Sequence, residues 1–505
     1  MVEPCYTCRR RRIQCDQSGI PCAKCTTSGL ECFDKRPLRW VKGVAIRGKM
    51  QGRSHKESSN VTDLVKSGPG PSAIEAFPVR LTVSRPEIPL ALGDPFASNL
   101  DAASKYYLDY YNDRICKLFI VYDSDENPFR SLISLAMSDQ TLFKAALALA
   151  ARHKANSTRS FYDTGLLEHP DSGAAHCDAL LYKHQAMQRL SQDLGNASGA
   201  KDTSMASIFL LIFLDLLESG SDRWNVHLEG VKRLIETNPL LSGSPVNPRL
   251  DPGRTVSEIR NFITRQLYLI ETLGATFVRP KLLSQFNFVA QSEAQLQETA
   301  EKSFLGCPEY LLNAIQSISM CRDQITGTEL LDDVSNYEYR CNVVKVLEFI
   351  HNFDCAIWAQ GLPHSDKSRD TNHLSILAQA YKLGAFLYGQ RVLDTLTNEE
   401  TPQGLVVDEL INAIGSVKDD RSILKCLLWP IFVAGLECHS HTGKEFLLGC
   451  LEQFWTDTSC LNVVNAAKIL QAYWKGQPEP DGDRGSFSSQ WIFTIGRLGR
   501  DWLLI

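Results

Sequence analysis

Apolar residues recur at three- or four-residue steps along most of the chain from about residue 98. The first such run is Leu100, Ala103, Tyr107, Tyr111, Ile115 and Leu118. The same spacing appears in three further groups: Leu142, Ala146, Leu149 and His153; Leu311, Ile315 and Ile318; and Val463, Ala467, Leu470 and Trp474. These steps place side chains on one face of an α-helix. No convincing series of alternating strands is found, so the pattern predicts a large all-α domain over residues 98–505.

Two local features of this helical region carry expectations of their own. Pro430 lies inside the apolar stretch LLWPIFV at 427–433. Proline lacks a backbone donor and clashes with the preceding turn, so a helix should kink or restart there. The final five residues, DWLLI at 501–505, mix one acidic side chain with bulky apolar ones. We expect a docked final helix, and a short segment that recruits coactivators is the alternative.

The first 97 residues have a different composition. Residues 50–97 are rich in Ser, Gly and Pro, which suits an irregular linker. Residues 35–49 are basic, with Trp40 as the one large aromatic; they could follow a nucleic-acid backbone, act in nuclear import, or pack on the cysteine unit before them. The chain is therefore divided into a cysteine unit at 1–34, a linker at 35–97 and a helical domain at 98–505.

Charge is distributed unevenly along the 505 residues. Residues 1–49 hold 11 Lys or Arg and 4 Asp or Glu, whereas the other 456 residues hold 42 and 54. The net charge of −5 therefore hides a basic N-terminal segment and an acidic remainder. The 44% content of apolar residues is enough for a large core. The longest uncharged apolar run, at 208–214, is far too short to span a membrane, so we expect a soluble, intracellular protein.

Six of the 16 cysteines are concentrated near the N-terminus. The motif C-x2-C-x6-C occurs twice there, and its members are Cys5, Cys8, Cys15, Cys22, Cys25 and Cys32. The N-terminus lacks the apolar run of a secretory signal, which favours a reducing compartment and metal binding over disulfides. A module of the RING type would need eight ligands, usually with His and longer gaps, and the first histidine is His55. A metallothionein-like buffer would not need the rest of the chain.

The number of thiolates points to two zinc ions. Zn²⁺ prefers four tetrahedral ligands, and cysteine thiolates are strong ligands for it. Six thiolates satisfy two such ions only if two sulfurs are shared. Because the motif is duplicated, the shared pair should be the equivalent first cysteine of each copy, Cys5 and Cys22.

The segment CYTCRRRRIQCDQSGIPCAKCTTSGLEC at 5–32 closely resembles the fungal-type zinc binuclear cluster, the DNA-binding domain of a large class of fungal transcription factors. The six-cysteine spacing, the basic run after Cys8, the Cys15–Asp16 pair and a proline just before Cys22 carry the resemblance. It implies two Zn²⁺ ions per chain and two short helices beside them. It also implies that the first helix enters the major groove of double-stranded DNA over a CGG-type triplet.

The resemblance also assigns DNA contacts. Arg12 occupies the position that reaches the guanines, and an Arg fork can bind guanine O6 and N7 together. Arg9, Arg10 and Arg11 suit phosphate contacts, and Lys24 suits one from the second half of the repeat. The alternative is that the arginine run is a solvated face or a nuclear import signal. Gln14 stands where the family commonly has Lys.

Segments of the helical region resemble the fungus-specific transcription factor regulatory domain. They lie at 106–156, 224–230, 306–309 and 429–435. The resemblance implies action in the nucleus and makes coactivator or corepressor proteins the expected partners. A homodimer is possible, but no sustained heptad in 33–97 supports one through a coiled coil.

No enzyme motif such as a P-loop or H-E-x-x-H is found, so catalysis is not expected. We expect structural roles for Cys438, His439 and His441, the nearest approach to a second metal set.

The leading hypothesis is a nuclear, sequence-specific DNA-binding transcription regulator. A zinc-stabilised adaptor for protein or RNA is the second, although only Tyr6 and Phe33 could stack on bases.

Overall fold

The computed structural model separates the chain into two compact units, residues 1–88 and 89–505, called here the head and the body. The structure describes residues 4–11, 13–16, 21–30, 32–33, 100–162, 170–195, 202–221, 223–237, 254–279, 282–283, 303–325, 333–362, 370–476, 491–495 and 500–505. The expected linker at 35–97, Trp40 included, lies outside these residues, and so does Arg12.

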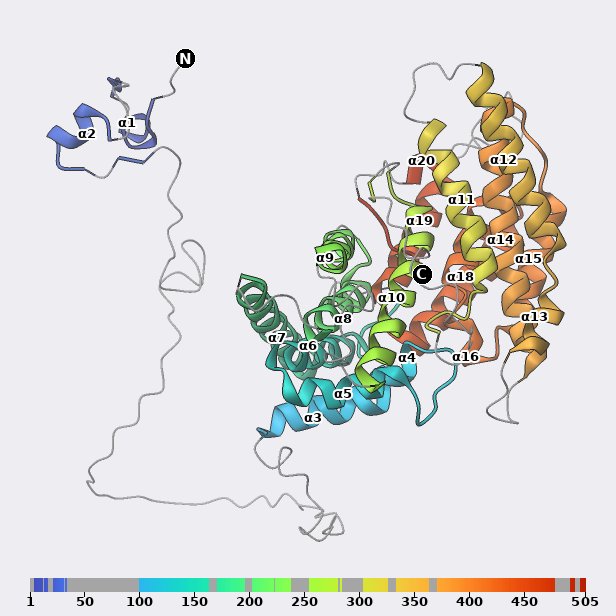
Figure 1. The fold of residues 1–505 in the computed structure, drawn as a ribbon, viewed down its shortest axis with the longest axis horizontal. Helices are drawn as coiled ribbons and strands as arrows, with labels where there is room; N and C mark the ends of the chain where they lie inside the picture. Colours follow the sequence, from blue (N-terminus) through green and yellow to red (C-terminus); the bar gives the residue numbers. More distant parts are fainter. Residues whose placement is uncertain are drawn as a thin grey trace, which may run out of the picture. The chain divides into compact units, whose positions relative to one another are not determined.

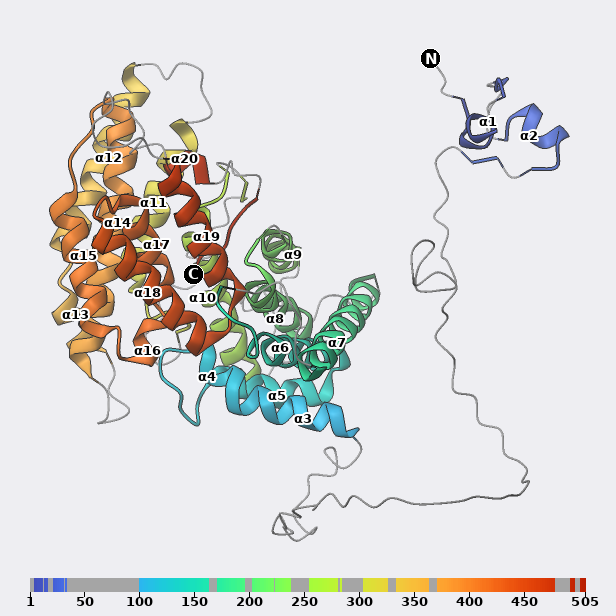
Figure 2. The same ribbon diagram turned by 180° about the vertical axis from the view of Figure 1, so that it is seen from behind.

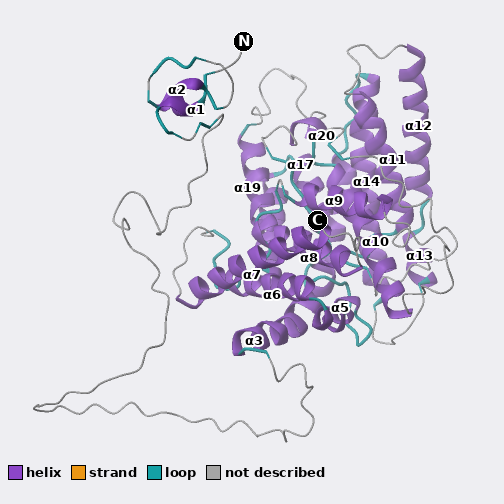
Figure 3. Ribbon diagram, turned by 60° about the vertical axis from the view of Figure 1, so that its left-hand side comes forward, coloured by secondary structure: helices purple, strands orange, loops and turns teal. Residues whose placement is uncertain are grey.

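The head contains two short helices in its described part, α1 (Tyr6–Arg10) and α2 (Ala23–Thr27). Helices are the regular secondary structure of the described body, which has no strand and a single isolated bridge (Figure 3). Its helices are α3 (Ala102–Tyr110), the π-helix η3 (Tyr111–Ile115), α4 (Cys116–Leu118), α5 (Pro128–Ser138), α6 (Gln140–Asn156), α7 (Pro170–Gly195), α8 (Asp202–Glu218), α9 (Trp224–Thr237), α10 (Arg254–Ala275), α11 (Glu309–Ile325), α12 (Asp333–Asn352), α13 (Cys355–Gly361), α14 (Thr371–Thr397), α15 (Gly404–Val417), α16 (Arg421–Leu424), α17 (Leu428–Glu437), α18 (His441–Thr458), α19 (Leu461–Lys475) and α20 (Trp491–Thr494). The predicted fold class, a small two-helix zinc module plus a large all-α domain, is confirmed.

Helix α8 forms the centre of the first half of the body. Its apolar run at 208–214 is buried on every side, as expected for a helix without a polar face. Helices α6, α9, α10 and α19 pack against it (Figures 1 and 2). Since α19 comes from the end of the chain, the first and last parts of the body share one hydrophobic core.

Helix α14 has the same central role in the second half. It contacts α11, α12, α13, α15 and α17. Figure 1 shows α11, α12, α13 and α15 beside it, and α17 is labelled next to it in Figure 2. The buried Trp429 of α17 stacks on Tyr381 of α14, with ring centroids 5.9 Å apart. Gly384 makes this approach possible, because a Cβ there would lie 2.7 Å from the Trp429 ring.

Aspartates start many of these helices. In each case the aspartate carboxylate accepts a hydrogen bond from a backbone N–H in the first turn of its helix. The helices are α3, α6, α13, α14 and α16, and their capping residues are Asp101, Asp139, Asp354, Asp370 and Asp420 in that order. These bonds satisfy donors that have no partner within the helix. The helix starts are therefore encoded locally.

Most helical expectations are confirmed. The predicted faces on α6 and α11 are buried, and on α19 only Trp474 is half-buried. The first run is only partly right, because η3 interrupts it and Ala103 is exposed. The helix does restart near Pro430: α16 ends at Leu424, and Pro430 lies in the first turn of α17. Proline is tolerated there, since the first N–H groups have no partner within the helix.

The expected final helix is wrong, although the segment is docked. Residues 501–505 are not helical, and all but Trp502 are buried. The backbone N–H of Leu503 donates to the Gly220 carbonyl at 2.7 Å. The Trp224 indole N–H donates to the Asp501 carbonyl at 3.1 Å, and Arg279 pairs with the Asp501 carboxylate at 2.8 Å. Contacts with distant segments therefore hold this end extended. Among the described helices, none is long and apolar enough to cross a membrane.

Candidate metal centre and nucleic-acid interface

The two copies of the cysteine motif adopt the same local structure. Cys5 and Cys22 each precede a short helix, and Cys8 and Cys25 lie within α1 and α2. Each helix therefore presents two sulfurs from one turn, as a C-x2-C spacing requires. The sulfurs themselves form the centre of the head, since the four cysteines just named are its buried cluster and Cys15 and Cys32 pack against them.

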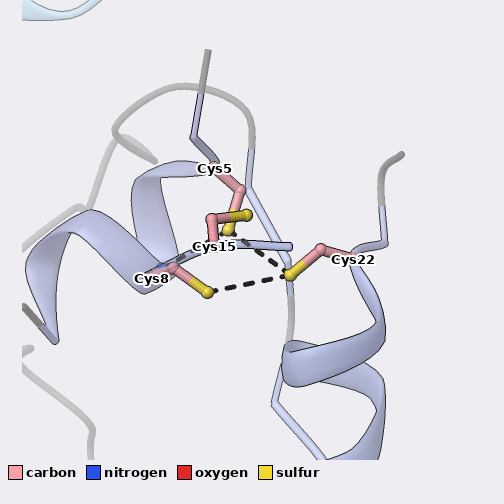
Figure 4. A group of neighbouring side chains, drawn as sticks. All are labelled: Cys5, Cys8, Cys15 and Cys22. Carbon is pink, nitrogen blue, oxygen red and sulfur yellow. Dashed lines mark hydrogen bonds between the residues drawn. The ribbon is translucent and has the colours of Figure 1, made fainter. Parts of the chain in front are cut away.

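The six sulfurs fall into two overlapping groups of four. One group is Cys5, Cys8, Cys15 and Cys22, and the other is Cys5, Cys22, Cys25 and Cys32. Within each group, all sulfurs lie within 4.8 Å of one another. Figure 4 shows the first group, with its side chains converging from α1, the segment after it and the start of α2. The two groups share Cys5 and Cys22, the pair that the duplication singles out.

The sulfur spacing suits tetrahedral zinc. A Zn–S bond of about 2.3 Å places neighbouring sulfurs of a tetrahedron about 3.8 Å apart. The Cys5 and Cys22 sulfurs are 3.8 Å apart, and the Cys8 and Cys22 sulfurs are 3.7 Å apart. Cys8 and Cys25, which belong to different groups, are also 3.7 Å apart, so the four buried sulfurs are closely packed.

The electrostatics of this centre call for a cation. Burial raises the pKa of the Cys8 thiol to about 12 and raises the pKa of Cys25 further. The pKa of Cys5 is lowered, because the backbone N–H of Cys8 donates to its sulfur. Several thiolates so close together would repel one another and lose hydration. Metal ions supply the positive charge that stabilises them.

Asp16 joins the two halves of the head. Its carboxylate accepts hydrogen bonds from the backbone N–H groups of Ala23, at 3.0 Å, and Lys24, at 3.4 Å. It thus caps α2, whose N-cap residue Cys22 makes no side-chain capping bond. Sequence reasoning noted Asp16 beside Cys15 but gave it no role. No local rule would have found one, because Asp16 lies six residues before the cap.

The arginines predicted to meet DNA lie at the C-terminal end of α1. Arg9 and Arg10 form its last turn and Arg11 is its C-cap, and all three are exposed. Cations at this end of a helix also oppose its dipole favourably. Lys24 is exposed, but its ammonium donates to the Gln14 carbonyl at 2.7 Å and so bridges the two halves. The positions of α2 that match Arg9, Arg10 and Arg11 carry Thr26, Thr27 and Ser28, and the basic residue in its last turn is Lys24.

Two family descriptions match the chain. The fungal Zn(2)-Cys(6) binuclear cluster domain matches residues 3–40, and the fungal specific transcription factor domain matches residues 106–505. The chain belongs to the fungal-specific transcription factors. It is a DNA-binding transcription regulator, and its cluster domain binds two zinc ions, as the ligand count predicted.

Two curated relatives agree with this assignment. The acriflavine sensitivity control protein acr-2 of Neurospora crassa is 23% identical over 566 aligned positions, which cover 94% of this chain and 92% of the relative. The transcriptional regulatory protein pro1 of the same fungus is 34% identical over 91 residues, which cover 16% of this chain and 13% of pro1. No solved structure matches the chain.

The transcription factor domain in the body contains the other residues considered from sequence. Cys438 is buried and its thiol donates to the Ser440 carbonyl, whereas His439 and His441 are exposed. Among the described residues, these three do not belong to a group whose ligand atoms all lie within 4.8 Å of one another, as the head cysteines do. His153 is buried beside the Tyr110 hydroxyl, 2.8 Å from Nδ1, and burial lowers its pKa to about 4.

Proposed function

We propose that this transcription factor reads CGG-type triplets in the major groove through α1, on a two-zinc centre in which Cys5 and Cys22 serve both ions. One observation carries the proposal: two four-sulfur groups overlap in these two cysteines, directly beside a helix that ends in exposed arginines. Cys8 and Cys15 would complete one site, and Cys25 and Cys32 the other.

The DNA contacts are of two kinds: contacts to the bases, which read the sequence, and contacts to the phosphates, which add affinity. We assign Arg12 to the guanines, because an Arg fork matches O6 and N7. The exposed guanidinium groups of Arg9, Arg10 and Arg11 would bind phosphates, which adds affinity but no sequence preference. Lys24 would add a phosphate contact only by giving up its bond to the Gln14 carbonyl. The exposed arginines at the end of α1, compared with two threonines and a serine at the matching positions of α2, support α1 as the reading helix.

The test compares two arginine variants of the zinc-loaded head on duplexes with and without the triplet. Arg12→Ala should lose about 1–3 kcal/mol on the triplet and relax discrimination at its guanines. Arg9→Ala should weaken all duplexes alike and reduce the salt slope by about one unit. An Arg12→Ala head that keeps its full preference for the triplet contradicts the assignment. Stronger binding to single-stranded RNA would favour the adaptor hypothesis instead.

We assign the three parts different tasks: a cluster domain at 1–34, a linker at 35–97 and a regulatory domain at 98–505. The body, acidic overall, should not attract DNA, and it would act on coactivator or corepressor proteins in the nucleus. Residues 1–60 should therefore bind a duplex with one triplet at least as tightly as the full chain at the same salt concentration. Much weaker binding by residues 1–60 alone would show that the body contributes DNA contacts. We assign the chain no catalytic role.

A further inference from the structure

The two halves of the head are joined by a matching pair of contacts. In each half, the residue after the third cysteine of the motif reaches the start of the other half's helix. The backbone N–H of Ala23 in α2 donates to the Asp16 carboxylate at 3.0 Å. The backbone N–H of Tyr6, the equivalent residue of α1, donates to the Phe33 carbonyl at 2.7 Å. The sequence duplication therefore repeats contacts between the halves as well as metal ligands.

A side chain from each helix completes the contact. It belongs to the second residue after the first cysteine of the motif, which is Lys24 in α2 and Thr7 in α1. The Lys24 ammonium donates to the Gln14 carbonyl at 2.7 Å, and the Thr7 hydroxyl accepts from the Phe33 N–H at 3.2 Å. Each junction thus combines a bond from the helix backbone with a bond from the next side chain of the same helix. Such a pair fixes the tilt of the segment on the helix as well as its distance.

The comparison of the two junctions indicates the role of Lys24. Thr7 occupies the equivalent position and makes its bond without a charge, so this position serves contact within the head in both halves. The surroundings of Lys24 also disfavour a phosphate. The Asp16 carboxylate accepts a bond from the Lys24 backbone N–H at 3.4 Å. A phosphate that approached this part of α2 would therefore be repelled by a carboxylate as well as attracted by the ammonium.

The carbonyl that Lys24 binds belongs to the segment that follows the basic end of α1. Arg11 is the C-cap of α1, the Ile13 N–H donates back to a carbonyl of α1 at 3.2 Å, and Gln14 comes next. The ammonium therefore ties this segment to α2, a helix that carries a ligand of the second four-sulfur group. Contacts to base edges need side chains placed to within about 0.5 Å, whereas contacts to phosphates carry no sequence information. The reading of bases should therefore depend on this tie.

We propose that Lys24 is a positioning residue for DNA reading. Its ammonium keeps the Gln14 carbonyl as its partner in the DNA complex and so holds the segment after α1 in place for base contacts. Lys24 then contributes to the preference for the triplet and not to the attraction of phosphates. The contribution to preference rests on the proposed reading through Arg12. The retained bond does not, because it should persist on any duplex.

The test compares Lys24→Met with Arg9→Ala in the full zinc-loaded chain, on duplexes with and without the triplet, over a series of salt concentrations. Methionine keeps an unbranched stem but cannot donate a hydrogen bond. Lys24→Met should lower the preference for the triplet about three- to tenfold, as for the loss of one hydrogen bond, and leave the salt slope unchanged. Arg9→Ala should do the reverse: it should flatten the slope by about one unit and leave the preference intact. Lys24→Arg keeps a donor and should restore most of the preference.

Two results with these variants would overturn the proposal. The first is a Lys24→Met chain that binds all duplexes more weakly with a salt slope flatter by about one unit, because a phosphate contact then explains Lys24. The second is a Lys24→Met chain with unchanged preference and unchanged slope. Native mass spectrometry should count two zinc ions on each variant, so that loss of metal is not mistaken for loss of positioning.

A second measurement uses the wild-type chain alone. The carbonyl ¹³C resonance of Gln14, labelled selectively, should keep its position when DNA binds. A shift to the position that Lys24→Met gives in the free protein would show that the bond is released, and would overturn the proposal. Failure of the reading itself is separate: an Arg12→Ala chain that keeps its full preference contradicts the reading. The salt slope and the Gln14 resonance then still decide whether Lys24 retains its bond.

Discussion

The head and the body are stabilised by different physical effects. The buried cluster of the head consists of cysteines alone in its described residues, whereas the body is organised around one large cluster of aliphatic and aromatic side chains. Chain segments of a few dozen residues bury too little apolar surface to fold without a metal or disulfides. The head therefore depends on its ions, and the body on hydrophobic burial. Each should be destroyed by a treatment that spares the other.

Zinc removal should give the largest effect. A chelator should unfold residues 1–49 and abolish DNA binding, because zinc binding supplies about 10–16 kcal/mol in small zinc domains. The thermal transition of the body in the full chain should not change. Circular dichroism of the head and calorimetry of the full chain measure the two effects. A head that keeps its helices without metal would contradict the conclusion that metal ions hold it together.

The cysteine variants extend this test. Cys22→Ala should be worse than Cys32→Ala, because a shared sulfur serves both ions and Cys32 serves one. Native mass spectrometry should count two zinc ions on the wild type. A count of one, or equal damage from the two substitutions, would argue against the shared pair.

Removal of Trp429 should be the strongest single perturbation of the body. Its ring is buried against Tyr381, and its indole N–H donates to the Thr276 hydroxyl at 2.9 Å. Trp429→Ala should lower the free energy of unfolding of the body by about 3–5 kcal/mol, through lost burial and a cavity. Leu405→Ala, at an exposed position, should cost little. Denaturant unfolding measures both, and zinc binding by the head should be equal in the two variants.

Acidification should lower the stability of the body through its buried His153. The pKa of His153 is about 4 in the folded protein, because of burial, against about 6.5 in the unfolded chain. Between these values the unfolded state binds more protons, so stability is lost as pH falls from about 7 towards 4. His153→Gln should remove about 2 kcal/mol of the pH dependence between pH 7 and 5. The measurement is the free energy of unfolding of the wild type and of His153→Gln as a function of pH. The same pH dependence in both proteins would contradict the prediction.

The smallest expected effect concerns the contact between the halves of the head. Asp16→Ala should cost about 1 kcal/mol, the usual contribution of a helix cap, while two zinc ions remain bound. Asp16→Asn keeps an oxygen acceptor and should retain most of the stability. Zinc competition titrations compare the three proteins. Equal zinc affinity in all of them would show that Asp16 makes no net contribution.

Much of the candidate site could be predicted from the sequence. The spacing of Cys5, Cys8 and Cys15 and its repetition concern residues close along the chain, so the ligand number follows without knowledge of the fold. The helical class was equally accessible, because one helix face is recorded in residues three and four positions apart. The interruption by η3 was not, since the periodicity continues through the π-helix.

The sequence by itself determined the type of metal centre, the helical class and the basic end of α1. Only the tertiary structure decided that Asp16 caps the helix of the other half and that residues 501–505 lie extended against Gly220 and Trp224. It also decided that Ala179 and Ala186 of α7 are buried whereas Leu180 and Met187 are exposed. The reason is physical: ligand spacing and helix periodicity depend on neighbours along the chain. Caps between segments, docked ends and exposed faces depend instead on which distant segments come into contact. Sequences with the same local pattern can bring different segments into contact.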